Sequence, residues 1–139
     1  MSDITTDVIT SKTVTENKML AFLPRKLPRH FLQFESCVYY FARNIIIEYS
    51  GGQWEFIELS NQGFYMRPLL GGSKVVVEID GNEFSGLVSE DAVGIIASIF
   101  SLNYLLFETQ EENLYKHYEA LIDYAHLHEE REQIFAAID

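Results

Sequence analysis

The feature that most constrains this chain is the stretch over residues 51–68, GGQWEFIELSNQGFYMRP. It predicts two short strands joined by a three-residue loop at Asn61-Gln62-Gly63, because Asn and Gly tolerate the backbone angles of tight hairpin turns. Large apolar side chains occupy both faces of both strands. A hairpin that is apolar on both sides is not stable alone in water. We therefore expect it to be the middle layer of a core, with helices covering its two faces.

The chain before the hairpin predicts an arm, an entry segment and one helix. Residues 1–17 are polar and rich in threonine, so we expect a flexible N-terminal arm, followed by one domain over residues 18–139. The proline-punctuated segment over residues 20–28 is expected to be extended. Pro28 can occupy the first turn of a helix, and apolar residues recur at helical spacing from there to about Tyr49.

The chain after the hairpin predicts two more strands and then helices. The strands fall at residues 74–80 and 84–88, separated by a Gly-Asn turn. Ser89, with Glu90 and Asp91 behind it, has the character of a capped helix start. The predicted helices cover residues 90–107 and 110–126, and residues 128–138 form either a further helical stretch or a continuation of the helix before them. The element order indicates an α+β single domain with an N-terminal helix, a small antiparallel sheet of three to four strands and C-terminal helices.

Composition and charge narrow the class of protein. The chain has 139 residues, is 47% hydrophobic and contains one cysteine, which suits a single core without an internal disulfide. The N-terminus lacks the layout of a signal peptide, and no apolar run suggests a membrane span, so a cytoplasmic protein is expected. The net charge is −11, and residues 90–139 hold eleven acids against two bases. This balance argues against strong nucleic-acid binding.

Residue types that carry chemistry are present, but their spacing does not form a catalytic or metal-binding pattern. The four histidines do not converge on one helix face, and Cys37 lies among apolar residues of the first helix, as a structural thiol does. The glycines near residue 71 lack the first glycine of a phosphate loop. Glu55 and Glu58 lie on opposite faces of one strand. We therefore predict no enzyme activity and no catalytic, cofactor or metal site.

The acidic C-terminal region allows an alternative, an acidic DNA mimic that inhibits a DNA-processing enzyme. Residues 108–132 hold eight acids, and Glu112, Glu119 and Asp123 fall near one helical face. As one helix this stretch would measure about 37 Å, over which duplex DNA carries roughly 22 charges. The acids reach under half of that density, which favours an ordinary solvated helix face.

A weak nucleic-acid-binding module is the other alternative. Basic side chains of the N-terminal region could meet phosphates while an exposed Tyr65 stacks on a base. Those basic residues are Lys18, Arg25, Lys26, Arg29 and Arg43. Burial of the hairpin aromatics is favoured over this alternative, because it accounts for apolar residues on both faces.

The hairpin residues also resemble a known family. The run YSGGQWEFIELSNQGFYMRP at residues 49–68 is similar to the signature of the ArdB/KlcA antirestriction proteins. Other runs on both sides of it occur in the same order as in that family. These are FLPR at 22–25, GNEFSG at 81–86 and SEDAVGI at 89–95. The resemblance covers about residues 20–125. The chain departs from it at Gln62, where a second glycine is common, and at Pro28.

The resemblance implies an accessory protein of mobile DNA, such as a plasmid, phage or genomic island. Such proteins protect incoming DNA from type I restriction–modification enzymes. The implied partner is a type I restriction enzyme or an associated host factor, and the choice between a monomer and a weak dimer stays open.

The hairpin is the predicted contact surface. Tyr65 and Arg67 share one strand face, and an arginine is costly to bury unpaired, so we expect that face to reach solvent. Aromatic and arginine side chains also dominate the binding energies of interfaces. The predicted partner-binding residues are Asn61, Gly63, Tyr65 and Arg67, with the acidic Glu112, Glu119 and Asp123 as the competing surface.

Overall fold

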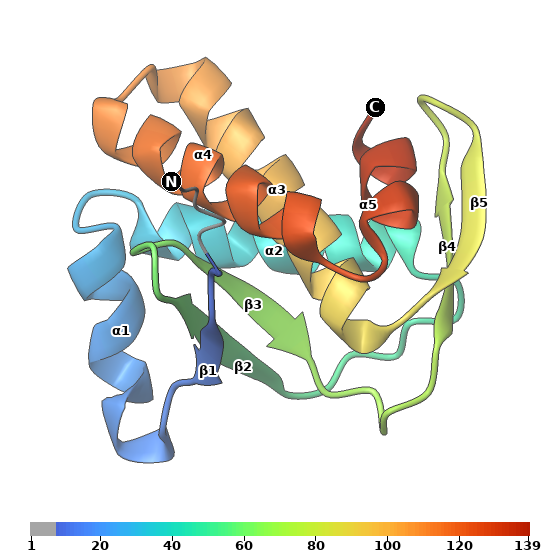
Figure 1. Cartoon of the computed structure of the whole chain (residues 1–139), viewed down its shortest axis with the longest axis horizontal. Coiled ribbons are helices and arrows are strands. Elements are labelled where there is room, and N and C mark those ends of the chain that lie inside the picture. Colours follow the sequence, from blue (N-terminus) through green and yellow to red (C-terminus); the bar gives the residue numbers. More distant parts are fainter. Residues whose placement is uncertain (1–7) are drawn as a thin grey trace, which may run out of the picture.

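The predicted hairpin lies at the centre of the molecule, with helices around it (Figure 1). This computed structural model describes residues 8–139. Its elements in chain order are β1 (Ser11–Thr13), the 3₁₀ helix η1 (Glu16–Lys18), α1 (Met19–Lys26), α2 (Phe31–Ile45), β2 (Trp54–Leu59), β3 (Phe64–Pro68), β4 (Val75–Ile79), β5 (Phe84–Val88), α3 (Glu90–Thr109), α4 (Glu112–Leu127) and α5 (Arg131–Ile138). The architecture confirms the predicted α+β class.

The strands form two antiparallel sheets, whereas the sequence predicts one. The first has the order β1-β2-β3, and the second contains only β4 and β5, which stand apart from it in Figure 1. Between β3 and β4 the chain passes through Gly71 and Gly72, both at positive φ (78° and 79°). Glycine adopts these angles at little cost, so the chain can turn away from the first sheet there.

The hairpin turn is close to the predicted one. The Leu59 N–H donates to the Gly63 carbonyl at 2.9 Å, which leaves residues 60–62 as a three-residue loop. Gln62 holds the positive φ of this loop (78°). Gly63 is required for space instead, because a Cβ there would lie 2.8 Å from the Cβ of Ala120 in α4.

Both faces of the hairpin are covered, as predicted. On one face the ring of Phe22 from α1 packs against Phe56 and Phe64, with ring centroids 5.4 and 5.7 Å away. Phe34 from α2 meets Phe64 from the same side. On the other face Tyr65 stacks on Tyr124 of α4 at 5.9 Å. The hairpin is therefore the middle layer of the core.

Helix α3 covers the free edge of β3. The outward-facing Met66 N–H donates to the Ser98 hydroxyl at 3.0 Å. A Cβ on Gly94 would lie 2.4 Å from the Met66 carbonyl oxygen and 2.9 Å from the Cα of Arg67, so the backbones of α3 and β3 are in direct contact there. An unpaired strand edge invites aggregation, and a closely packed helix blocks it.

Helix α3 begins as the sequence predicts and is the most buried helix. The Ser89 hydroxyl accepts the Ala92 N–H at 3.0 Å, and Glu90 and Asp91 occupy the first turn. Contrary to the sequence-based expectation, α3 is long and apolar enough to cross a membrane by length and composition. Most of this apolar surface is buried inside the core.

The segment predicted to be extended is instead helix α1. Pro24 lies inside it, at the cost of one backbone hydrogen bond. The helical turn directs Phe22 and Leu23 into the core, where both are buried. Burying these two side chains contributes about 1.5–3 kcal/mol each, which offsets the lost bond. Tertiary packing thus overrides the local effect of the proline.

Helix α2 ends at Ile45, earlier than the predicted Tyr49. The next residues leave the helix to meet the second sheet: Ile46 forms a bridge with Val77, and the Ile47 N–H donates to the Val76 carbonyl at 3.0 Å. These contacts with β4 account for the earlier end of the helix.

Part of the predicted flexible arm is structured. Strand β1 pairs with β2, with Ser11 opposite Leu59, and Val14 is buried. Its three side chains are exposed and polar, so only the backbone joins the sheet, and the apolar pattern gives no sign of it. The prediction for residues 1–7 falls outside the described part of the chain.

Replacing Gly94 with alanine tests the contact between α3 and β3. Helix propensity alone would make Gly94→Ala stabilising by up to about 1 kcal/mol. The Cβ would instead strike backbone atoms, so we expect the free energy of unfolding in urea to fall by about 1–3 kcal/mol. Gly81→Ala is the control, because its Cβ meets no atom within 4 Å. An increase in stability for Gly94→Ala would contradict the packing described here.

Candidate functional site

Arg67, a predicted contact residue, is held by two carboxylates inside the molecule. Its Nε donates to Glu55, its cross-strand neighbour, at 2.7 Å, and its Nη1 donates to Asp91 at 2.8 Å. The side chain is 25% exposed. The arginine thus meets its need for partners within the fold.

Asp91, in the first turn of α3, is the centre of this polar network. Its carboxylate accepts the Tyr65 hydroxyl at 2.6 Å, the Arg67 guanidinium and the His128 ring at 2.8 Å. Burial opposes ionisation of Asp91, but these hydrogen bonds outweigh it and lower its pKa to about 2. Asp91 therefore connects α3 to the hairpin and to the junction between α4 and α5.

His128 and Asp91 resemble a catalytic dyad, but both ring nitrogens of His128 are engaged. Nε2 faces Asp91, and Nδ1 accepts the Glu130 N–H at 2.9 Å. The hydrogen bond to Asp91 raises the pKa of His128. Protonation at Nδ1 would displace the Glu130 N–H, so the neutral ring is the form that satisfies both contacts. The arrangement orients the α4–α5 junction rather than a nucleophile.

Tyr65 is wrongly predicted to reach solvent. It is fully buried beneath Tyr124, and burial together with Asp91 raises its pKa far above the usual value. It is therefore unavailable to a partner or to a nucleic-acid base without unfolding. The face it shares with Arg67 is an internal face of the core.

The hairpin turn also points into the molecule. The Asn61 side-chain amide donates to the Ala120 carbonyl of α4 at 2.9 Å, and Gly63 is buried. Lys26 of α1 donates to the Gln62 carbonyl at 3.0 Å. The turn thus joins α1 and α4, and its exposed residues are Ser60 and Gln62.

The competing acidic surface is exposed. Glu112, Glu119 and Asp123 all lie on solvent-facing positions of α4. Glu112 has a neighbouring cation, Lys116, at 3.6 Å. The nearby Glu111 is ion-paired with Arg29 and also contacts the ring of His30. The negative charge of this region is thus partly compensated by the chain itself.

Several cations of the N-terminal region are likewise paired. Lys26 is buried and lies 3.2 Å from Glu58, and Arg25 lies 3.5 Å from the same carboxylate. Arg29 lies 3.5 Å from Glu111. These ion pairs weaken the basic surface that phosphates require. The structure therefore gives weaker support to the nucleic-acid-binding alternative than the sequence gives.

Metal-ligand residues and the cysteine do not form a reaction centre in the described part of the chain. Within residues 8–139 no three His, Cys, Asp or Glu side chains gather as a metal site would require. Cys37 is half-buried, and burial raises the pKa of its thiol, which disfavours the reactive thiolate.

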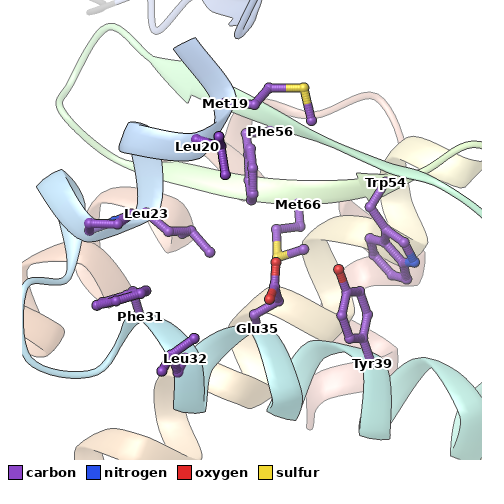
Figure 2. A pocket seen from close by; sticks show the side chains of 11 residues that line it. Met19, Leu20, Leu23, Phe31, Leu32, Glu35, Tyr39, Trp54, Phe56 and Met66 are labelled. Carbon is purple, nitrogen blue, oxygen red and sulfur yellow. The ribbon is translucent and has the colours of Figure 1, made fainter. Parts of the chain in front are cut away.

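An apolar groove that the sequence does not predict opens on the surface of the described chain. It lies between α1 and α2, with β2 and β3 as its floor, and has a volume of about 410 Å³ (Figure 2). Leu20 and Leu32 line it and are 95% and 64% exposed. Glu35, Tyr39 and Trp54 also line it, and Figure 2 shows Glu35 and Tyr39 pointing from α2 toward the strands. We call it the α1–α2 groove.

The α1–α2 groove continues into a second hollow of about 470 Å³, which Tyr39 and Trp54 also line. Arg43 lines this second hollow. Burial, and then Glu35 through its charge and a side-chain hydrogen bond, raise the pKa of Tyr39 to about 12. Tyr39 is thus a neutral partner for Glu35. A concave apolar site with a few polar groups is typical of a binding surface.

These features define a class of protein: a small α+β protein whose polar network is structural and whose open surfaces suit binding. The comparisons with known proteins name the family. Residues 47–139 match the sequence model of the family described as antirestriction protein. The chain therefore belongs to the antirestriction protein family, which confirms the resemblance seen in the hairpin.

Individual relatives extend this match to nearly the whole chain. Two proteins called antirestriction protein KlcA, both from Escherichia coli, are 36% and 37% identical to it over 136 and 138 residues. These alignments cover 94% of this chain, and 95% and 94% of those proteins. The putative antirestriction protein YubI of Escherichia coli strain K12 is 35% identical over 133 residues, 91% of this chain and 93% of that protein.

A solved structure has the same fold. It superposes with a TM-score of 0.89 at 35% identity, and covers 99% of this chain and 100% of the solved chain. It comes from work describing a novel fold of the KlcA and ArdB proteins, with antirestriction activity against type I DNA restriction systems in vivo but not in vitro.

The network predicts that acid destabilises the protein through Asp91. Its folded-state pKa of about 2 lies below the ordinary 3.8, so its contribution is complete above 3.8 and is lost as pH falls toward 2. We expect protonation of Asp91 to lower the free energy of unfolding by about 2 kcal/mol between pH 4.5 and pH 2. The measurement is urea denaturation of the wild type and Asp91→Asn at both pH values. An equal loss in the two proteins would contradict the role given to Asp91.

Charge reversal at Arg67 should destabilise the fold rather than remove a contact surface. Arg67→Glu would place a third carboxylate beside Glu55 and Asp91. We expect the unfolding free energy to fall by roughly 2–3 kcal/mol, less than for a fully buried pair because Arg67 is partly exposed. Arg25→Glu, at an exposed arginine with one 3.5 Å pair, is the control and should cost less than about 1 kcal/mol. Equal melting temperatures for the two variants would refute this prediction.

Proposed function

We propose that this protein protects incoming DNA of a mobile element from type I restriction–modification, and that it acts in the cytoplasm through protein contacts without catalysis. The observation that carries the proposal is the match to an antirestriction structure over 99% of the chain at a TM-score of 0.89. The engaged nitrogens of His128 and the half-buried Cys37 support the non-catalytic part.

The relatives favour an action that needs a component of the living cell. The KlcA and ArdB proteins are described as active in vivo but not in vitro. A protein that bound the restriction enzyme alone would be expected to inhibit it in a purified reaction as well. We therefore favour an associated host factor, or a state of the enzyme found only in cells, over the isolated enzyme as the direct partner.

The acidic DNA-mimic alternative receives less support. Glu111 is ion-paired with Arg29, and Glu112 lies near Lys116, so part of the negative charge is compensated. Duplex DNA presents one charge per about 1.7 Å, a density that requires its mimic to be largely uncompensated.

Phage plating tests the proposal and separates it from mimicry. We expect expression of the wild type to raise the plating efficiency of unmodified phage on cells carrying a type I restriction system. The triple variant Glu112→Lys, Glu119→Lys and Asp123→Lys should protect as well as the wild type, because these exposed acids are not the contact surface. Modified phage, which the host does not restrict, is the control for general effects on growth.

Two results would count against the proposal. Equal restriction of unmodified phage with and without the wild-type protein would refute antirestriction activity. Loss of protection by the triple variant, with an unchanged melting temperature, would restore charge mimicry as the preferred mode.

A further inference from the structure

The α1–α2 groove has the properties of a peptide-binding site. Two large apolar side chains, Leu20 and Leu32, lie at its edge and are 95% and 64% exposed. Leaving such residues in water is unfavourable, and apolar surfaces bordered by polar groups mark sites of protein interaction. In Figure 2 their helices form the two walls, Phe56 lies beside α1, and Trp54 lies over Tyr39 of α2 at the other end of the groove.

The groove also carries one negative charge in apolar surroundings. Glu35 lies on α2 among the groove residues, and within residues 8–139 no cation is within ion-pair distance of its carboxylate. Tyr39 lines the same groove and, with its pKa raised to about 12, supplies no positive charge. A carboxylate in this setting attracts a cationic group from an occupant. The neighbouring aromatic rings of Tyr39 and Trp54 favour a cation as well.

The dimensions of the groove suit a short segment of chain. Its residues on α2 run from Phe31 to Tyr39, about 12 Å along the helix axis. That length matches about two helical turns or four extended residues. The adjoining hollow places Arg43 one helical turn beyond Tyr39, so the lining charge changes from negative to positive along the groove.

We propose that the α1–α2 groove binds a short amphipathic segment of a partner protein, with apolar side chains against Leu20 and Leu32 and an arginine or lysine against Glu35. The identity of the partner as the antirestriction target rests on the proposed function; the binding chemistry does not. Because Glu35 is negative and Arg43 is positive, the bound segment has one preferred orientation along the groove.

A fluorescence titration tests the binding chemistry directly. Trp54 is the only tryptophan of the chain and lines the groove, so its emission reports occupancy. The probes are three amphipathic 14-residue peptides that carry a leucine stripe interrupted by one arginine, citrulline or glutamate. We expect the arginine peptide to bind roughly fivefold to tenfold more tightly than the citrulline peptide, and the glutamate peptide to bind most weakly.

Two variants assign this preference to the groove. Glu35→Gln should make the arginine and citrulline peptides bind equally, and Leu32→Glu should weaken binding of all three. Both proteins must melt like the wild type. No saturable change in Trp54 emission, or equal binding of the arginine and glutamate peptides, would overturn the proposal. Concentration-dependent dimerisation of the wild type that Leu32→Glu abolishes would also overturn it, because the occupant would then be a second copy.

Phage plating then tests whether the groove serves antirestriction. We expect Leu20→Glu with Leu32→Glu to abolish protection, while Phe107→Glu, at an 80% exposed residue of α3 outside the groove, retains it. Full protection by the double variant would overturn the role of the groove and leave the proposed function standing. Absence of protection by the wild type would refute the proposed function, and the peptide titration would still decide the binding chemistry.

Discussion

The rest of the structure depends on the burial of a hairpin that carries large apolar side chains on both faces. Phe56 and Phe64 require α1 and α2 on one side, and Tyr65 requires α4 on the other. The edge of β3 requires a third cover, which α3 supplies through the contact at Gly94. Each buried aromatic contributes about 1.5–3 kcal/mol, so these contacts together fix where every large helix lies.

The same burial determines what the hairpin cannot do. Arg67 lies on a covered face, so it takes Glu55 and Asp91 as partners, and Asp91 in turn fixes Tyr65 and His128. The Tyr65–Arg67 face has the residue types of a docking surface, but in this fold it joins the sheet to α3 and to the α4–α5 junction. Binding is left to surfaces other than the Tyr65–Arg67 face, such as the α1–α2 groove on the opposite face and the acidic face of α4.

The sequence predicts those features that local rules determine. The hairpin, the Ser89 cap and the helices from residue 90 onward follow from side-chain periodicity and turn chemistry, and the structure confirms them. It does not predict helix α1, because Pro24 signals an interruption that only the packing of Phe22 and Leu23 overrides. Helix α1 is one wall of the α1–α2 groove. Because the sequence predicts an extended segment there instead, it does not predict the groove. Tyr65 is misplaced for a related reason: periodicity shows which residues share a face, but not which face a later helix covers.

Protein contact through the α1–α2 groove and not through α4 is the central functional claim, and crosslinking in restricting cells tests it most directly. A photoreactive amino acid would be placed at position 32, in the groove, or at position 123, on the acidic face. Both positions are exposed and lie on helices, so the photoreactive side chain is accessible to solvent in both proteins. A discrete crosslinked species is expected from position 32 and none from position 123. Crosslinking from position 123 alone would contradict the claim and place the interaction on the acidic surface.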